Sequence, residues 1–149
     1  MAAERGGDRA AVVLGELGKK LANADVARIG FLGGATYPNG TPVAMIAAVN
    51  EFGRPPVQPP RPYFRNMIAA NKREWPDAIA GLLKANDYDA DRALDQAGAA
   101  IAGQLRQSIV NLWEPPLAPS TIRRKGFDKP LIDTSMLLNS IDHEVVKSR

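Results

Sequence analysis

The chain has 149 residues, a length that suits one domain with a single core. Hydrophobic residues make up 45% and charged residues 23%, an ordinary globular composition that favours neither disorder nor a fibre. The absence of cysteine excludes disulfides, zinc–thiolate sites and cysteine nucleophiles, and the net charge of +3 falls short of the dense basic stripe typical of nucleic-acid binders.

The first 25 residues are predicted to form an N-terminal arm and a short helix. Residues 1–9 mix charges, lack the apolar stretch of a signal peptide and are expected to be flexible. Apolar residues recur at steps of three to four over 10–22, which predicts a short amphipathic helix. Since no apolar run approaches the ~20 residues that span a bilayer, we expect a soluble protein with no membrane partner.

A single domain is predicted over residues 26–149, beginning with a strand at 26–32. Alternation places Ala27, Ile29 and Phe31 on one face of that strand. A turn at 37–40 is followed by a helix in which Thr41 is the expected cap and Pro42 the first residue. That helix is predicted to end at Gly53.

Five prolines stiffen the loop over 54–62, which is interpreted as a rigid connector or a subunit-contact loop. A polyproline ligand for another domain is the alternative. Residues 63–84 have a helical period that Pro76 must kink or split. The clearest helix covers about 90–112, with Asp89 as a candidate cap.

The C-terminal third is predicted to hold two short helices and a strand. A helical turn is expected over 120–125, ended by Gly126, and a second short helix runs through Asn139 after a cap at Asp133 or Thr134. Residues 141–146 alternate as a half-buried strand does. The expected fold class is therefore α+β, with a small antiparallel or mixed sheet packed against the long helix of about 90–112 and shorter helices.

No motif in the sequence marks an active site, so we expect no enzyme, no cofactor, no metal and no small-molecule substrate. The single histidine, His143, lies in the terminal strand and is interpreted as structural. Asp87, Asp89 and Asp91 alternate as calcium ligands do, but the glycine and later glutamate of such a loop are missing, which favours helix capping. Of the tryptophans, Trp75 is predicted to be core, whereas Trp113 is either core cover or a subunit contact.

Three segments in order resemble a family of tailed-phage proteins. The first is Val43-Ala44-Met45-Ile46-Ala47-Ala48-Val49-Asn50-Glu51-Phe52-Gly53, and the second is Pro59-Pro60-Arg61-Pro62-Tyr63-Phe64-Arg65. The third runs from Leu117-Ala118-Pro119 through Arg123-Arg124-Lys125-Gly126 to Leu131-Ile132-Asp133-Thr134-Ser135-Met136-Leu137, where Ser135 replaces the family's usual glycine. Together they resemble the neck or tail-completion proteins of long-tailed phages, which are related to the virion-morphogenesis proteins of Mu-like phages.

The resemblance covers roughly residues 26–146 and implies a structural role without catalysis or cofactor. It implies an α+β fold and an oligomeric ring, expected to be hexameric, between the head connector and the tail tube. The expected partners are further copies of the chain, the head–tail connector and the tail terminator or tube proteins, with a passive contact to packaged DNA left open. The expected location is the virion neck, after assembly in the host cytoplasm.

Two segments are predicted to make the subunit or connector contacts, namely the proline loop and the basic stretch of 121–129. The candidate contact residues are Arg54, Pro55, Pro56, Arg61, Arg123, Arg124, Lys125 and Lys129. Two rival functions remain open on the sequence. One is a tail terminator that caps the tail tube, and the other is a basic nucleic-acid-binding module, for which salt-sensitive DNA binding would be diagnostic.

Overall fold

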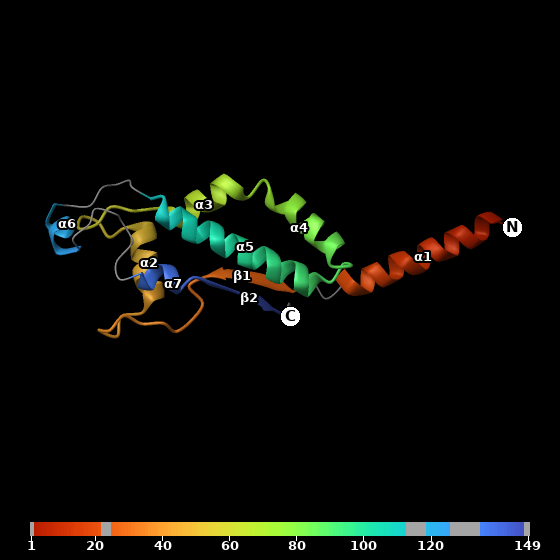
Figure 1. Cartoon of the computed structure of the whole chain (residues 1–149), viewed down its shortest axis with the longest axis horizontal. Helices are drawn as coiled ribbons and strands as arrows, with labels where there is room; N and C mark the ends of the chain where they lie inside the picture. Colours follow the sequence, from red (N-terminus) through yellow and green to blue (C-terminus); the bar gives the residue numbers. More distant parts are fainter. Residues whose placement is uncertain (1, 22–24, 113–118, 126–134, 148–149) are drawn as a thin grey trace.

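The computed structural model describes residues 2–21, 25–112, 119–125 and 135–147. Its elements follow one another along the chain as a long helix, a strand, six further helices and a second strand within these ranges (Figure 1). They are α1 (Ala2–Leu21), β1 (Val26–Gly30), α2 (Val43–Phe52), α3 (Tyr63–Asn71), α4 (Trp75–Ala85), α5 (Ala90–Val110), α6 (Pro119–Lys125), α7 (Met136–Asn139) and β2 (Asp142–Val146).

The sheet is an antiparallel pair that joins the two ends of the predicted domain. Val26 pairs with Val146 and Gly30 pairs with Asp142, so β1 and β2 match over their whole length. Helix α5 packs on this pair, and α3 and α4 pack on α5 from the other side, as Figure 1 shows. The fold is therefore α+β, with a small antiparallel sheet against a long helix, as the sequence predicts.

The core lies where α2, α3, α5 and α7 meet near one end of the sheet. Its buried side chains come from segments far apart in the sequence, and α5 contributes Ala102, Leu105 and Ile109 to it. They are Val43, Ala47, Tyr63, Met67, Ala102, Leu105, Ile109, Leu112, Leu137 and Ile141. The Tyr63 hydroxyl donates to the main-chain oxygen of Ala47 at 2.9 Å, which satisfies the polar end of this buried ring.

Helix α5 confirms most of what its sequence pattern predicts. The Asp89 side chain accepts a hydrogen bond from the Arg92 amide at 3.1 Å, so Asp89 is the cap. The helix ends at Val110, two residues before the predicted end. Small buried residues of α5 that the sequence pattern does not single out include Ala93, Gly98 and Ala102, and at Gly98 the His143 side chain of β2 packs closely against the helix.

The start of α2 differs from prediction, whereas the end of α2 and the break at Pro76 agree with it, and each has a reason in backbone chemistry. Helix α2 begins at Val43, because Pro42 is extended (ψ 132°) and serves as the N-cap without a side-chain hydrogen bond, so Thr41 is not the cap. Gly53, at φ 75°, ends α2 as predicted. Pro76 splits the predicted 63–84 helix into α3 and α4, because proline is tolerated only in the first turn of α4.

Strand β1 is shorter than predicted, because Gly30 ends it. Its φ of 146° turns the chain out of the strand, while Phe31 still packs against the core. Ala27, Ile29 and Phe31 are all partly buried, and on β2 His143 and Val145 are partly buried, so the predicted inward faces of both strands are confirmed.

Helix α1 contradicts the prediction of a flexible arm at residues 1–9. The helix starts at Ala2 and runs for 20 residues, because glycine lowers helix propensity by about 1 kcal/mol without forbidding a helix and alanine favours one. Figure 1 shows α1 leaving the body at the end of the molecule opposite to α2 and α6. Lys20 ties its last turn to Asp87 at 3.0 Å.

The third family-like segment enters the described structure at Ser135. This residue adopts the left-handed conformation (φ 61°) that glycine favours, so the chain keeps that geometry although serine replaces glycine. It is the N-cap of α7 and makes no side-chain cap bond. The N-cap is therefore Ser135 and not the predicted Asp133 or Thr134. The predictions for Gly126 and Trp113 lie outside the described residues. Among the helices that are described, none combines the length and apolarity that a bilayer span requires.

Candidate interaction surface

The predicted contact loop is a compact turn whose outward side chains are exposed. The Arg54 amide donates to the Gln58 carbonyl at 2.8 Å, and the Val57 and Gln58 amides both donate to the Arg54 carbonyl at 2.9 Å. Arg54, Pro55 and Pro56 are all exposed on this turn. The loop is therefore held rigid by its own backbone, and three of its four candidate contact residues face solvent.

Arg61 departs from the predicted contact role, because its side chain is buried. Only 6% of the residue is exposed, and its Nε atom has no hydrogen-bond partner among the described residues. Burial lowers the pKa of its guanidinium, since a charged group is less stable away from water. Its backbone amide donates to the Asn50 carbonyl at 2.7 Å. Arg61 therefore belongs to the interior of the chain and not to its exposed surface.

The predicted basic stretch is described in part. Arg123 and Arg124 lie on α6 and are exposed, and Lys125 is the last residue of that helix. Lys129 lies outside the described residues. Figure 1 shows α6 and the proline loop toward the same end of the long axis, opposite to the N-terminus. The two segments that the sequence singles out as contacts thus share one end of the molecule.

Glu51 connects the end of α2 to the start of α3. Its residue is 5% exposed, and its carboxylate accepts hydrogen bonds from the Phe64 amide at 2.9 Å and the Arg65 amide at 3.2 Å. The Arg65 Nε adds an ion pair at 2.8 Å. Amides in the first turn of a helix have no intrahelical partner, so Glu51 serves as a remote cap for α3.

Beside Glu51 lies an apolar groove that the sequence does not reveal. It has a volume of about 380 Å³ and lies between α2, the end of β1 and the start of α3. Ala44, Ala48 and Phe52 line it from α2, and the segment of 29–32 lines it from β1. Phe52 is 66% exposed, and the Arg65 guanidinium lies 5.3 Å from its ring centroid.

The sequence pattern of the 43–53 segment does not by itself show that the Phe52 ring is exposed. The signal that was available is the spacing of Ala44, Ala48 and Phe52, which are four residues apart and so share one helix face. That face differs from the one that buries Val43 and Ala47. The two faces adjoin at ~100° around the helix, and Ala47 lines the groove as well, so the apolar surface of α2 continues from the core into the groove.

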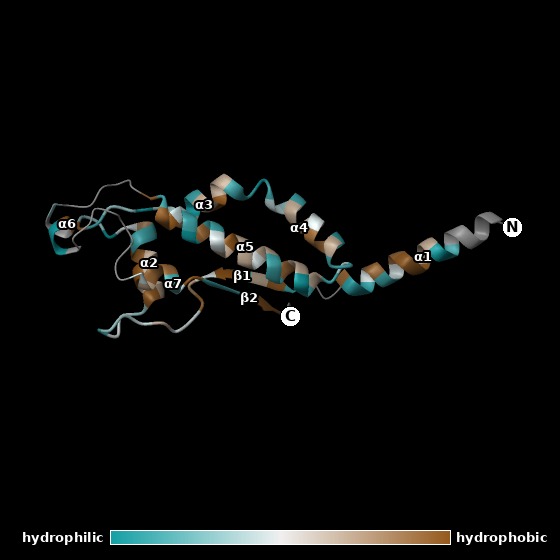
Figure 2. Ribbon diagram, in the orientation of Figure 1, coloured by the Kyte–Doolittle hydropathy of each residue, from teal (hydrophilic) through white to brown (hydrophobic). Residues whose placement is uncertain are grey.

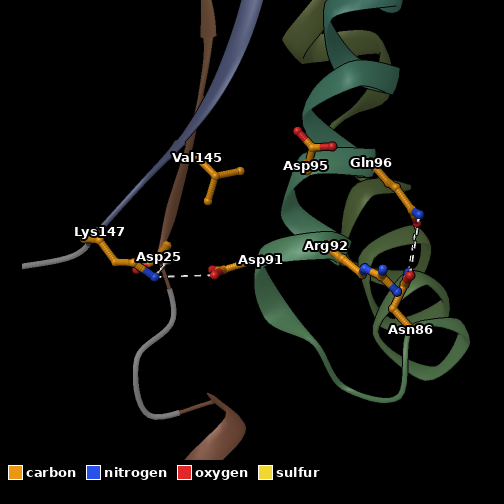
Figure 3. Close-up of a pocket in the computed structure, with 8 residues that line it drawn as sticks. All are labelled: Asp25, Asn86, Asp91, Arg92, Asp95, Gln96, Val145 and Lys147. Atoms are coloured by element: carbon orange, nitrogen blue, oxygen red, sulfur yellow. Dashed lines mark hydrogen bonds and ion pairs between the residues drawn. The ribbon is translucent and has the colours of Figure 1, made fainter.

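A larger but polar hollow of about 730 Å³ lies at the other end of the sheet, between the start of β1, the end of β2 and α5 (Figure 3). Lys147 bridges Asp25 at 2.8 Å and Asp91 at 3.4 Å. Asp25 also hydrogen-bonds to Asp91, which raises the pKa of the Asp91 carboxyl, and the two carboxylates raise the pKa of Lys147. On the far wall, Asn86 donates to Gln96 at 2.8 Å.

The groups in this hollow join the ends of the two strands to helix α5. Within the described ranges no group of three His, Cys, Asp or Glu side chains could hold a metal ion. His143 lies nearby, and its Nε2 is 2.9 Å from Asp95 Oδ1. The imidazole packs on Gly98, where an added Cβ would come within 2.8 Å of the ring. This geometry agrees with the structural role predicted for His143.

Comparison of the chain with protein-family models, with curated protein sequences and with solved structures found no match. The family resemblance of the sequence motifs therefore remains a proposal, and the residues of the chain itself must carry the functional argument.

Proposed function

We propose that the protein is a structural subunit of a tailed-phage virion, a neck or tail-completion protein that joins the head connector to the tail as part of a ring. Its partners would be further copies of the chain, the connector, and the terminator or tube proteins of the tail. It would act in the virion neck after assembly in the host cytoplasm, and the proposal assigns it no catalysis and no cofactor.

The observation that carries the proposal is the contact between the first two family-like segments. Glu51, from the Asn-Glu-Phe-Gly segment, accepts the amides of Phe64 and Arg65 from the Pro-Pro-Arg-Pro-Tyr-Phe-Arg segment. Asn50 accepts from Gln58 at 2.6 Å and, through its carbonyl, from the Arg61 amide. Residues of the two motifs thus hydrogen-bond to each other. These contacts are a structural reason for the two motifs to occur together in one chain.

The extent of the resemblance also fits a self-contained unit. It covers residues 26–146, and the β1–β2 pairing brings Val26 against Val146. The ends of the family-like region therefore meet in the sheet, while α1 lies before it. An exposed proline turn and an exposed pair of arginines at one end of this unit suit a protein whose task is to contact neighbours.

The proposal is tested by deleting the gene from the phage that encodes it and imaging the particles. Loss of a completion protein leaves tails of normal length beside filled heads to which they do not join. Overlong tails would assign the chain to the tail terminator instead. Joined, infectious particles at wild-type titre would overturn both functions.

A charge-reversal variant tests the predicted contact segment. Arg123→Glu combined with Arg124→Glu and Lys125→Glu is expected to leave the isolated chain folded and to reduce the yield of joined particles. Lys72→Glu with Arg73→Glu and Lys84→Glu, at three exposed positions away from the contact segments, is the matched control because it reverses the same number of charges. Wild-type yields from both variants would contradict the assigned role. Tight DNA binding by the wild type at ~50 mM salt, lost only in the first variant, would favour the nucleic-acid-binding alternative.

A further inference from the structure

Most of the exposed large apolar side chains in the described ranges lie on or beside two helices. Ten such side chains are exposed, and eight of them lie either on α1 or on α2 and the loops beside it. On α1 they are Val12, Val13, Leu14 and Leu21, and on and beside α2 they are Leu32, Met45, Phe52 and Val57. Leu14 and Leu21 share one face of α1, and Leu32 and Phe52 line one groove, and apolar residues gathered in this way mark binding surfaces, whereas single ones need no explanation.

Helix α1 carries an apolar seam with the spacing of a helix-docking segment. The residues of the seam follow one another at steps of three, four, three and four, which keeps them on one face. They are Gly7, Ala10, Leu14, Leu17 and Leu21. Arg9, Glu16 and Lys19 fall on the other faces, and Val12 lies among them, about 160° around the helix from Leu14 at ~100° per residue. Leu14 is 68% exposed.

The apolar groove beside α2 has the shape that such a seam requires. Ala44 and Ala48, one turn apart and both exposed, leave room for larger side chains from outside. Phe52 closes one end of this row, and Leu32 lies on the opposite wall. A helix that lays leucines onto alanines fills the space that small side chains leave, as helix-in-groove recognition does. Figure 2 shows hydrophobic segments on both α1 and α2.

The groove of the same chain is out of reach of its own seam. Lys20 holds the last turn of α1 to Asp87, at the end of the molecule opposite to α2 (Figure 1). If α1 folded back along β1, Leu14 would lie ~10 Å beyond Leu21 at ~1.5 Å per residue. The strand covers ~16 Å between Asp25 and Gly30 at ~3.3 Å per residue, so the leucines would lie beside 26–28 and not at the groove.

We propose that the seam of α1 docks into the α2 groove of a second copy of this chain, with Leu14, Leu17 and Leu21 as anchors. The two surfaces are different and lie on opposite halves of the molecule, so the contact is heterologous and repeats from copy to copy until it closes. This contact rests on the proposed function, because a ring requires a head-to-tail contact between its copies. It adds to that function by naming the two surfaces that meet.

The size of the contact sets the affinity to expect. Helix α1 is ~30 Å long and ~10 Å wide, so one face on a neighbour covers on the order of 600 Å² over both partners. That is below the ~1,200 Å² of stable complexes and typical of weak ones. The isolated chain is expected to associate with a dissociation constant in the micromolar range, and ring closure strengthens a contact of this kind.

The test compares substitutions on the two faces of α1 in the full-length chain. Sedimentation from about 10 to 500 µM is expected to show wild-type association that Leu14→Glu weakens more than about tenfold, because it places a charge in an apolar contact. Val12→Glu, at a 61% exposed position on the polar face, is the matched control and is expected to associate like the wild type. Circular dichroism and thermal unfolding establish that each variant folds.

The receiving surface is tested in the same way and then by mixing. Ala48→Arg is expected to abolish association, while Ala69→Arg, at an exposed alanine of α3, leaves it unchanged. Leu14→Glu retains a groove and Ala48→Arg retains a seam, so an equimolar mixture is expected to form a 1:1 dimer that neither forms alone. Since the chain has no cysteine, Leu14→Cys in one copy and Ala44→Cys in another are expected to form a disulfide with each other.

Three results would overturn the contact: a wild type that stays monomeric over this range, an Ala48→Arg variant that associates like the wild type, or a mixture that does not form the dimer. Each is measured on the isolated chain. A monomeric wild type alongside tails that fail to join heads in the deletion phage would refute this contact and leave the neck function standing. If association depends on the seam but the deletion phage still gives infectious particles, the contact would stand and the neck function would be refuted.

Discussion

Two carboxylates, Glu51 and Asp25, are both buried and both paired with an exposed cation, yet they hold their surroundings in different ways. Glu51 lies at the α2 end, where two backbone amides of α3 and the Arg65 side chain donate to it. Asp25 lies at the far end of the sheet, where it contacts Lys147 at 2.8 Å and hydrogen-bonds to Asp91. One carboxylate is thus bound largely by backbone, the other by side chains.

The difference shows what each end of the molecule depends on. Backbone amides are placed by the fold, so Glu51 pays little conformational entropy for its partners and α3 loses its cap if the carboxylate is removed. The Lys147 side chain is 78% exposed and must be held in place by its two carboxylates, which gives a weaker and more salt-sensitive link. The close packing of His143 on Gly98 also holds β2 to α5, beside the contact of His143 Nε2 with Asp95 Oδ1 at 2.9 Å.

The largest effect is expected at Glu51. Glu51→Ala leaves the Phe64 and Arg65 amides without their acceptor and removes the ion pair, and we expect it to lower the free energy of unfolding by about 3 kcal/mol. Glu51→Gln retains one acceptor oxygen and is expected to cost about 1 kcal/mol. Urea unfolding measures both. Equal losses in the two variants would contradict the capping role.

Gly98→Ala tests whether packing holds the sheet end. The new Cβ meets His143 Cδ2 at 2.8 Å, and we expect a loss of about 2 kcal/mol, larger than the helix-propensity gain of about 1 kcal/mol. In a His143→Ala background the same change is expected to be neutral or stabilising, since the obstructing ring is gone. A double-mutant cycle by urea unfolding measures this coupling. Purely additive effects on the free energy of unfolding would show that the His143 ring is not what opposes a Cβ at position 98.

Asp25→Asn is expected to have a smaller effect than Glu51→Ala. It removes the charge that Lys147 contacts, and we expect a loss of about 1 kcal/mol in the free energy of unfolding that shrinks as salt is added. Glu144→Gln, which breaks an exposed 3.8 Å pair with Arg28 on the same strands, is the control, with a change under about 0.5 kcal/mol. If Asp25→Asn lowers the free energy of unfolding as much as Glu51→Ala does, the two ends of the molecule do not differ in how strongly their carboxylates stabilise them.

The pH dependence of Asp91 is the smallest and most specific effect. The neighbouring Asp25 raises the pKa of the Asp91 carboxyl above the ordinary value of 3.8, because protonated Asp91 can donate a hydrogen bond to the Asp25 carboxylate. The folded state therefore holds the Asp91 proton more tightly than the unfolded chain, so this contribution favours folding at low pH and is lost as pH rises through the raised pKa. Carboxyl NMR titration is expected to show that value falling toward 3.8 in Asp25→Asn. An unchanged titration would show that the two carboxyls are not linked.

The α+β class, α5 with its Asp89 cap and the terminal strand could all be predicted, because each rests on local periodicity or on capping chemistry. The exposed Phe52 and the buried Arg61 could not. The exposure of these two side chains depends on how α2 packs against α3. A phenylalanine or an arginine at the same positions could be buried or exposed, depending on that packing. Helix α1 was missed at its start because its glycines imply a break that the flanking alanines outweigh.

The register of the sheet has a mechanical consequence. Val26 and Val146 are paired, so the chain enters and leaves the domain at the same end of an antiparallel ladder. A pull that separates the two chain ends acts across the strands and opens their hydrogen bonds one pair after another, instead of shearing them all together. The domain would therefore resist tension poorly through its ends. A load that acts on the sides of the packed helices, and not on the two chain ends, would not pull on this ladder.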